Sequence, residues 1–290
     1  MDFRADLAQM MDEFAGNIDY DELMAFSEVL REEGNLIPLL YRYTPADYYN
    51  IRNLEKGELF LSKAGQMNDI FEGLSGYADA DTIENIDRIS DIAYIKSFSE
   101  NENDPHMWGI YATEYSGMCV QYDLRRMMGK EDYYSYLFPV HYGPERYIKG
   151  LLDKYTAEDF HAYRNGNDEG KAKHAEYLFN VTSAFLSKAE CWKQEKEWRL
   201  VVPYVRMHFE EDFWCRYKDD DDDVNYTIKS ELIKFPYATR IYIGPRMERI
   251  KREHLIEIGE KKGIEVYETR IASGKYALES RKVGTEQWHD

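Results

Sequence analysis

The spacing of apolar and polar residues predicts helices and strands in irregular succession along the chain. Residues 1–35 carry apolar side chains every three or four positions, which is typical of two short amphipathic helices. After residue 38, short apolar runs bounded by Gly, Pro, Asn and Asp indicate strands. The pattern predicts strands at 38–43, 58–62, 93–99, 117–123, 197–202, 240–244 and 264–267, and helices at 44–56, 82–90, 106–114 and 248–260.

Helices and strands do not alternate regularly, so the order of the elements favours an α+β fold over a doubly wound sheet. We expect an N-terminal helical hairpin at 1–35 and a single α+β domain at 36–272. This domain contains a charged helical insert at about 145–190, and a C-terminal tail follows at 273–290. The hairpin is interpreted as a lid on the core or, alternatively, as a docking element for a protein partner.

Composition narrows the classes of partner. The chain of 290 residues has 37 Lys and Arg against 55 Asp and Glu, which gives a net charge of −18. Proteins that coat nucleic acid or an anionic membrane need a basic surface, so both partners are disfavoured, although a small basic pocket is compatible with this charge. The apolar share of 43% is too high for a disordered chain.

The cysteines and the N-terminus predict a soluble cytoplasmic protein. Three scattered cysteines (Cys119, Cys191 and Cys215) fit neither a disulfide framework nor a four-thiolate zinc site. The acidic N-terminus lacks the basic and apolar layout of a signal peptide. No apolar run reaches the roughly 20 residues that a membrane span requires.

Several common catalytic motifs are absent from the sequence. It has no P-loop, no Gly-x-Gly-x-x-Gly after a strand, no His-Glu-x-x-His and no Gly-x-Ser-x-Gly. The seven histidines are dispersed, and the five carboxylates at Asp219–Asp223 lack the spacing of a calcium loop, so we expect no metal site. This excludes P-loop kinases, Rossmann dehydrogenases, zincins and α/β-hydrolases.

Polar residues at strand ends are the remaining candidates for a site. Arg42 lies within an otherwise apolar and aromatic strand, and a guanidinium at a pocket mouth is a good phosphate ligand. Ser97 and Ser99 are expected on one face of their strand, because side chains alternate with period two. The same alternation predicts that Glu195 and Glu197 share a face, where two carboxylates need a cation or a substrate hydroxyl as a partner.

In this order, Arg42, Ser97-x-Ser99 and Glu195-x-Glu197 resemble the layout of Arg-Ser-Glu class ADP-ribosyltransferases. At closer range the chain, from about residue 38 to 250, resembles the bacterial family of domain of unknown function 2971. The segments that carry this resemblance are Asn68-Asp69-Ile70-Phe71-Glu72, Ser97-Phe98-Ser99-Glu100, Met107-Trp108-Gly109-Ile110-Tyr111, Gly117 to Asp123, Trp192 to Arg199 and Ile243-Gly244-Pro245-Arg246-Met247.

The transferase resemblance implies an ADP-ribosyltransferase-like split sheet and NAD as the substrate. Glu197 would bind the ribose hydroxyl and stabilise an oxocarbenium-like state, and Glu195 would activate an acceptor of unknown identity. Arg42, helped by Arg52 or Arg246, would hold the NAD phosphates. Further NAD contacts are expected from Ser97, Ser99, Tyr43, Asn68 and Trp108. Such an enzyme would transfer ADP-ribose or hydrolyse NAD, as bacterial toxins and phage-defence effectors of this class do.

Three alternatives stay open. The scaffold could serve as a non-catalytic sensor that binds a nucleotide or a peptide, or the two glutamates could belong to a carboxylate hydrolase. The third alternative is purely structural. Glu195 and Glu197 would form ion pairs with Lys193, Lys196 or Arg199, and Arg42 would form an ion pair with Asp47. Ser97 and Ser99 would then cap the turn after residue 99.

Overall fold

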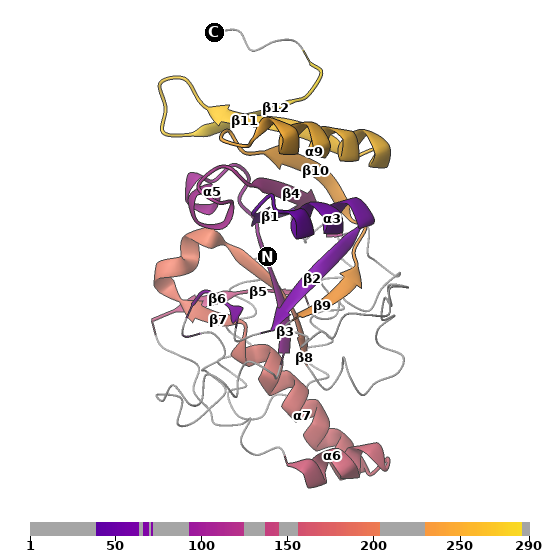
Figure 1. Cartoon of the computed structure of the whole chain (residues 1–290). Coiled ribbons are helices and arrows are strands. Elements are labelled where there is room, and N and C mark those ends of the chain that lie inside the picture. The colour runs from indigo at the N-terminus through magenta and orange to yellow at the C-terminus, as the bar shows by residue number, and fades with distance from the viewer. Residues whose placement is uncertain are drawn as a thin grey trace. The chain divides into compact units, whose positions relative to one another are not determined.

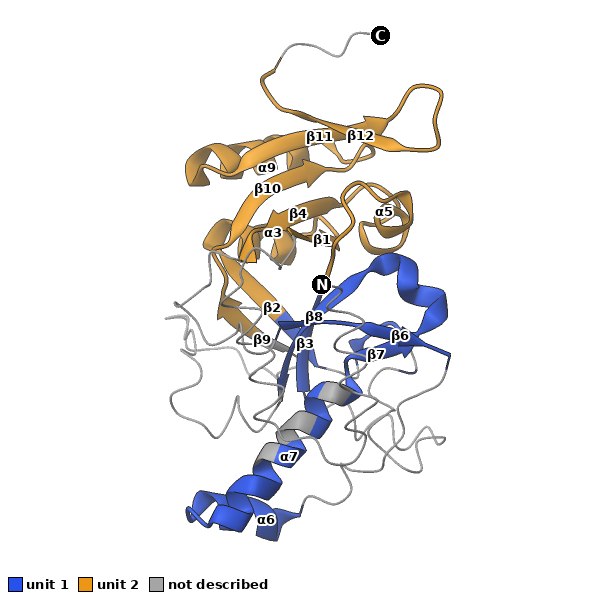
Figure 2. Cartoon of the chain, turned by 180° about the vertical axis from the view of Figure 1, so that it is seen from behind, with its two compact units in different colours: residues 1–36, 61–97, 128–231 blue, residues 37–60, 98–127, 232–290 orange. Residues whose placement is uncertain are grey.

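The structure, a computed structural model, describes residues 39–63, 66–69, 71, 93–124, 137–144, 156–203 and 230–285 (Figure 1). These residues form a mixed α+β fold with a large mixed sheet and several helices, which agrees with the predicted fold class. The predicted hairpin at 1–35, the helix at 82–90 and the Asp219–Asp223 run lie outside the described residues. The chain divides into two compact units, each drawn from three separate segments (Figure 2).

Unit 2 comprises residues 37–60, 98–127 and 232–290 and contains five neighbouring strands in the order β12-β11-β10-β4-β1. Only β10 and β11 are parallel, and the other neighbours are antiparallel. β12 lies within the segment that the sequence predicts as a C-terminal tail. The strand bounds are Leu40–Thr44 (β1), Met118–Tyr122 (β4), Ala238–Ile243 (β10), Glu265–Ile271 (β11) and Leu278–Lys282 (β12).

The helices of unit 2 begin and end at residues suited to those positions. α3 spans Tyr48–Lys56 between an Asp47 cap and Gly57, whose φ of 68° is a left-handed conformation that favours glycine. α9 spans Arg249–Lys262 and joins the parallel strands β10 and β11.

α5 spans Pro105–Tyr111, which begins one residue before the predicted helix at 106–114, and it is capped by Asp104. It ends before the predicted residue 114, because residues 113–115 adopt positive φ angles of 49°, 51° and 72°.

The core of unit 2 is rich in aromatic side chains. Tyr41, Tyr43 and Tyr242 from the strands pack with Trp108 of α5 and with Cys119 of β4. Tyr43 and Trp108 meet edge to face, with their ring centroids 5.4 Å apart, and Trp108 is fully buried. The aromatic residues around the predicted Met-Trp-x-x-Tyr segment therefore form the packing between α5 and the sheet.

Unit 1 comprises residues 1–36, 61–97 and 128–231, of which the described part contains a second group of paired strands. β8 pairs with β3 and β5, while β3 also pairs with β2, and β6 pairs with β7 in a separate small sheet. β3 continues from unit 1 into unit 2, where its last residue, Ser99, pairs with Tyr41 of β1. The strand bounds are Ala93–Ser99 (β3), Leu137–Pro139 (β5), His141–Gly143 (β6), Ser187–Ala189 (β7) and Glu197–Pro203 (β8). Two further strands, β2 (Glu58–Lys63) and β9 (Ser230–Lys234), are divided between the two units.

The described part of the predicted helical insert consists mainly of two packed helices. α6 spans Ala157–Arg164 and begins with a capping box between Thr156 and Asp159. α7 spans Asp168–Ala184, and the rings of Tyr163 and His174 stack between the two helices at 3.8 Å. The insert region also contains the short strand β7. None of the helices in the described ranges is both long and apolar enough to cross a membrane.

Candidate functional site

The predicted serine and glutamate motifs meet in unit 1, because β3 and β8 are paired strands. The Ser97 hydroxyl on β3 lies close enough to the Glu197 carboxylate at the start of β8 to favour the ionised form of that carboxylate. Ser97 Oγ is itself buried and has no hydrogen bond of normal geometry. The structure therefore brings two of the predicted site residues, Ser97 and Glu197, close together.

Glu197 is held by two cations. Arg199 Nε donates to Oε1 at 2.8 Å and Arg199 Nη2 donates to Oε2 at 3.0 Å, while Lys188 Nζ lies 3.0 Å from Oε2. The glutamate is only 4% exposed. Burial by itself would raise the pKa of Glu197, but the charges of Arg199 and Lys188 outweigh it and lower this pKa to about 2.

The second predicted glutamate also binds Lys188, whose Nζ lies 2.7 Å from Glu195 Oε2. However, Glu195 is the last residue of the 3₁₀ helix η6 (Glu190–Glu195), and Lys196, with φ of 45°, separates it from β8. The prediction that the two glutamates share one strand face was therefore wrong. They converge on Lys188 because the chain turns between them.

These four side chains form a buried, electrically balanced cluster of Lys188, Glu195, Glu197 and Arg199, which we call the charge cluster. Arg199 also donates from Nη1 to the carbonyl oxygen of Phe185 at 2.7 Å. Each side chain is 5% exposed or less. Removing two opposite pairs of charges from water requires such mutual compensation, so the cluster has the properties of a structural anchor.

The sequence gives a partial signal for the two cations of the charge cluster. The alternation of β8 places Arg199 on the same face as Glu197, and the structural alternative names Arg199 as one of three possible partners of the glutamates. Lys188 was not predicted, although a single lysine within the apolar stretch 184–189 is unusual unless it is paired.

Arg42 belongs to unit 2, where its guanidinium bonds to a neighbouring helix. Arg42 Nη2 donates to Asn50 Oδ1 at 3.0 Å, and Asn50 Nδ2 lies 3.0 Å from each carboxylate oxygen of Asp47. Burial lowers the pKa of Arg42, although interactions with Tyr122 and Asp47 oppose this shift. Asn50 therefore bridges the pair that the structural alternative predicted as a direct contact.

The other predicted NAD contacts have structural partners. The Tyr43 hydroxyl donates to the Asn101 carbonyl oxygen at 2.7 Å, and Ser99 Oγ accepts from the Asn101 amide at 3.0 Å. Trp108 is fully buried, so neither of its ring faces is available to a ligand in this conformation. Asn68 lies in unit 1, in a bend next to Asp69, whose carboxylate accepts from the Phe71 amide at 3.0 Å.

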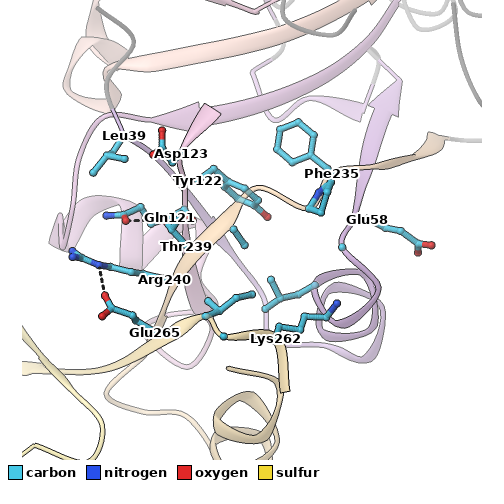
Figure 3. Close-up of a pocket in the computed structure, with 16 residues that line it drawn as sticks. Leu39, Glu58, Gln121, Tyr122, Asp123, Phe235, Thr239, Arg240, Lys262 and Glu265 are labelled. Carbon is cyan, nitrogen blue, oxygen red and sulfur yellow. Dashed lines mark hydrogen bonds and ion pairs between the residues drawn. The ribbon is translucent and has the colours of Figure 1, made fainter. Parts of the chain in front are cut away.

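A polar pocket of about 580 Å³ lies within unit 2 (Figure 3). Its walls come from the ends of α3 and α9, the end of β4 and the beginnings of β10 and β11. Arg240 Nε donates to Glu265 Oε2 at 3.1 Å, and the Thr239 hydroxyl donates to Gln121 Oε1 at 2.9 Å. The lining residues are Leu39, Leu54, Gly57, Glu58, Gln121, Tyr122, Asp123, Phe235, Pro236, Ala238, Thr239, Arg240, Lys262, Gly263, Ile264 and Glu265.

Sequence reasoning missed this pocket, because its residues come from five separate segments and carry no recognisable motif. Only topology brings them together. Among the described residues, no three His, Cys, Asp or Glu side chains are grouped so that they could hold a metal ion.

Comparison with known proteins identifies one family. Residues 107–200 match the model of the family described as protein of unknown function (DUF2971). This stretch includes the Met-Trp-x-x-Tyr segment of α5 and the whole charge cluster, so it supports the family resemblance over these residues. No curated protein and no solved structure matches the chain.

Proposed function

We propose that this chain is a non-catalytic binding module whose ligand, a nucleotide or a peptide, occupies the polar pocket of unit 2. A volume of about 580 Å³ falls within the range of small-molecule sites, and the lining combines polar groups with aliphatic and aromatic walls.

The observation that carries this proposal is the occupation of both Glu197 oxygens by Arg199 and Lys188. Stabilising an oxocarbenium-like transition state needs a carboxylate whose charge is directed at the substrate. In the charge cluster, two cations already compensate two carboxylates, so little net field remains for a substrate. A role in holding unit 1 together explains the same contacts without a reaction.

The test is ligand-dependent thermal stability of the full chain, measured with NAD, ADP and short peptides. A ligand that binds only the folded state raises its stability in proportion to the logarithm of its concentration. We expect at least one of these ligands to raise the unfolding temperature, and Thr239→Val to reduce that shift. Thr285→Val is the matched control, because Thr285 is exposed and lies outside the pocket lining. Absence of any shift would contradict the proposal.

A second candidate function is NAD-dependent ADP-ribosyl transfer or NAD hydrolysis, and the proximity of Ser97 and Glu197 on paired strands favours it. The low pKa of Glu197 keeps its carboxylate ionised at neutral pH. A carboxylate that stabilises an oxocarbenium-like cation has to be ionised. On an ADP-ribosyltransferase-like fold, NAD would be the substrate, and the acceptor would be a macromolecule or a small molecule. A bacterial toxin or phage-defence effector would use such chemistry.

Release of nicotinamide from labelled NAD separates the two candidates. If the second is correct, the wild type releases nicotinamide and Glu197→Gln does not. Because Glu197→Gln also breaks the charge cluster, Ser97→Ala provides a variant that keeps all four charges and is expected to lower the rate at unchanged stability. Release that is absent from the wild type, or that is unaffected by both substitutions, would contradict ADP-ribosyl transfer.

A further inference from the structure

We propose that the unit 2 pocket selects an organic cation, namely an alkylammonium or guanidinium group. This inference rests on the proposed binding function and specifies its ligand class. The same group occurs on a lysine or arginine side chain of a peptide and on a free polyamine, and the pocket volume accommodates a ligand larger than one side chain.

The first argument is the direction of the two helices that reach the pocket. Gly57 and Gly263, the C-terminal cap residues of α3 and α9, both belong to the lining. The C-terminal end of an α-helix carries about half a negative charge, because its last carbonyl groups are aligned. Two such ends directed to one pocket favour a positive group and disfavour a phosphate.

The second argument is the balance of charged side chains in the lining. Three carboxylates, those of Glu58, Asp123 and Glu265, face two cations, Arg240 and Lys262. Glu265 is paired both with Arg240 and with Lys282, whose Nζ lies 2.6 Å from its Oε1, so this carboxylate is compensated and a ligand cation would have to interact with the other carboxylates of the lining. The chain as a whole carries a net charge of −18, so its field adds to the local attraction for cations.

Glu58 supplies an independent requirement for a donor. This residue is 6% exposed, and its buried Oε2 has no hydrogen-bond partner among the described residues. A buried carboxylate oxygen without a donor is costly, and a cationic N–H group would remove that cost. Figure 3 shows the Glu58 carboxylate at the edge of the pocket, directed away from the other labelled residues of the lining. A ligand therefore has to reach this edge to satisfy it.

The pocket walls suit the methylene chain that carries such a cationic group. Leu54 and Ile264 provide aliphatic surface. Tyr122 and Phe235 also belong to the lining, and their ring centroids lie 5.4 Å apart. Methylene groups of lysine, arginine or a polyamine bury readily against such surface while the charged end binds polar groups.

The experiment is isothermal titration of the full chain with spermidine and with acetyl-Gly-Arg-Gly-amide. ADP and acetyl-Gly-Glu-Gly-amide serve as anionic comparators. We expect saturable binding of the two cations, and Asp123→Asn should weaken it about three- to fivefold, as expected for one partly solvated charge. Glu257→Gln is the matched control, because it removes the same charge from an exposed site on α9 outside the pocket.

The outcomes separate this inference from the proposed function. Binding of ADP without binding of either cation would retain a binding module and overturn the cation inference. Equal weakening by Asp123→Asn and Glu257→Gln would also overturn it, since the attraction would then come from net charge alone. Binding of none of the four compounds would overturn both. If only the peptide or only spermidine binds, the inference holds and the source of the cation is identified.

Discussion

Arg199 binds Glu197 through two parallel hydrogen bonds, from Nε to Oε1 at 2.8 Å and from Nη2 to Oε2 at 3.0 Å, although the two residues are only two positions apart on β8. The Arg199 side chain is fully buried. A charge in that position depends on its partners, because it cannot return to water without unfolding of the surrounding structure. The pair therefore makes the stability of unit 1 sensitive to the charges of a few side chains.

Arg199→Met should reduce the free energy of unfolding by about 3–5 kcal/mol, because it leaves two buried carboxylates with one cation. Arg199→Lys keeps the charge but loses the paired geometry, so we expect an intermediate loss. Urea unfolding at neutral pH measures both. Lys193→Met is the control, since the exposed Lys193–Glu190 pair should contribute less than about 1 kcal/mol. A loss in Arg199→Met no larger than in this control would contradict a structural role.

The low pKa of Glu197 predicts a specific dependence of stability on pH. A carboxylate whose pKa falls from 4.5 in the unfolded chain to about 2 in the folded chain stabilises the fold above pH 4.5. This contribution is lost as the pH falls from about 4.5 to 2. Glu197→Gln should be less stable than the wild type at pH 7, and the difference should shrink over that interval. Denaturation at several pH values measures it, and a constant difference would contradict the prediction.

Asp47 caps α3, and its Oδ1 accepts from the Asn50 amide at 2.8 Å. Asp47→Ala should cost about 0.5–2 kcal/mol, which is typical of a lost helix cap. Asp47→Ser restores a capping oxygen without the negative charge. Recovery of stability in the serine variant would show that capping dominates. An equal loss in both variants would instead assign the effect to the charge near Arg42, measured again by urea unfolding.

The sequence predicted seven of the twelve strands of the described residues, because their signal is local, and missed the strands β5, β6, β7, β9 and β12. β3 has the predicted bounds, and Asp104 and Pro105 mark the beginning of α5 as expected. The errors arise where backbone conformation departs from the pattern. Lys196 adopts a left-handed conformation, so the alternation that begins at Glu197 cannot be extended back to Glu195. The unit 2 pocket could not be predicted, because its walls come from distant segments brought together by the order of the strands.

The charge cluster also predicts a non-additive effect between Lys188 and Glu195. Within the charge cluster, Lys188→Met alone leaves one cation, Arg199, with the two buried carboxylates. Adding Glu195→Gln removes the excess negative charge and leaves the balanced pair of Arg199 and Glu197. The double variant should therefore be more stable than Lys188→Met, with a coupling free energy above about 1 kcal/mol.

The exposed ion pair of Lys193 and Glu190 is the control in the same urea-unfolding series. The losses in the free energy of unfolding caused by Lys193→Met and Glu190→Gln should add to within about 0.5 kcal/mol. A double variant of Lys188 and Glu195 that is less stable than Lys188→Met would mean that the hydrogen bonds of Glu195, and not the balance of charge, stabilise the cluster. Restored stability would instead show that unit 1 requires charge neutrality at this position. It would also mean that Glu197 can be studied as an isolated pair with Arg199, without the second carboxylate.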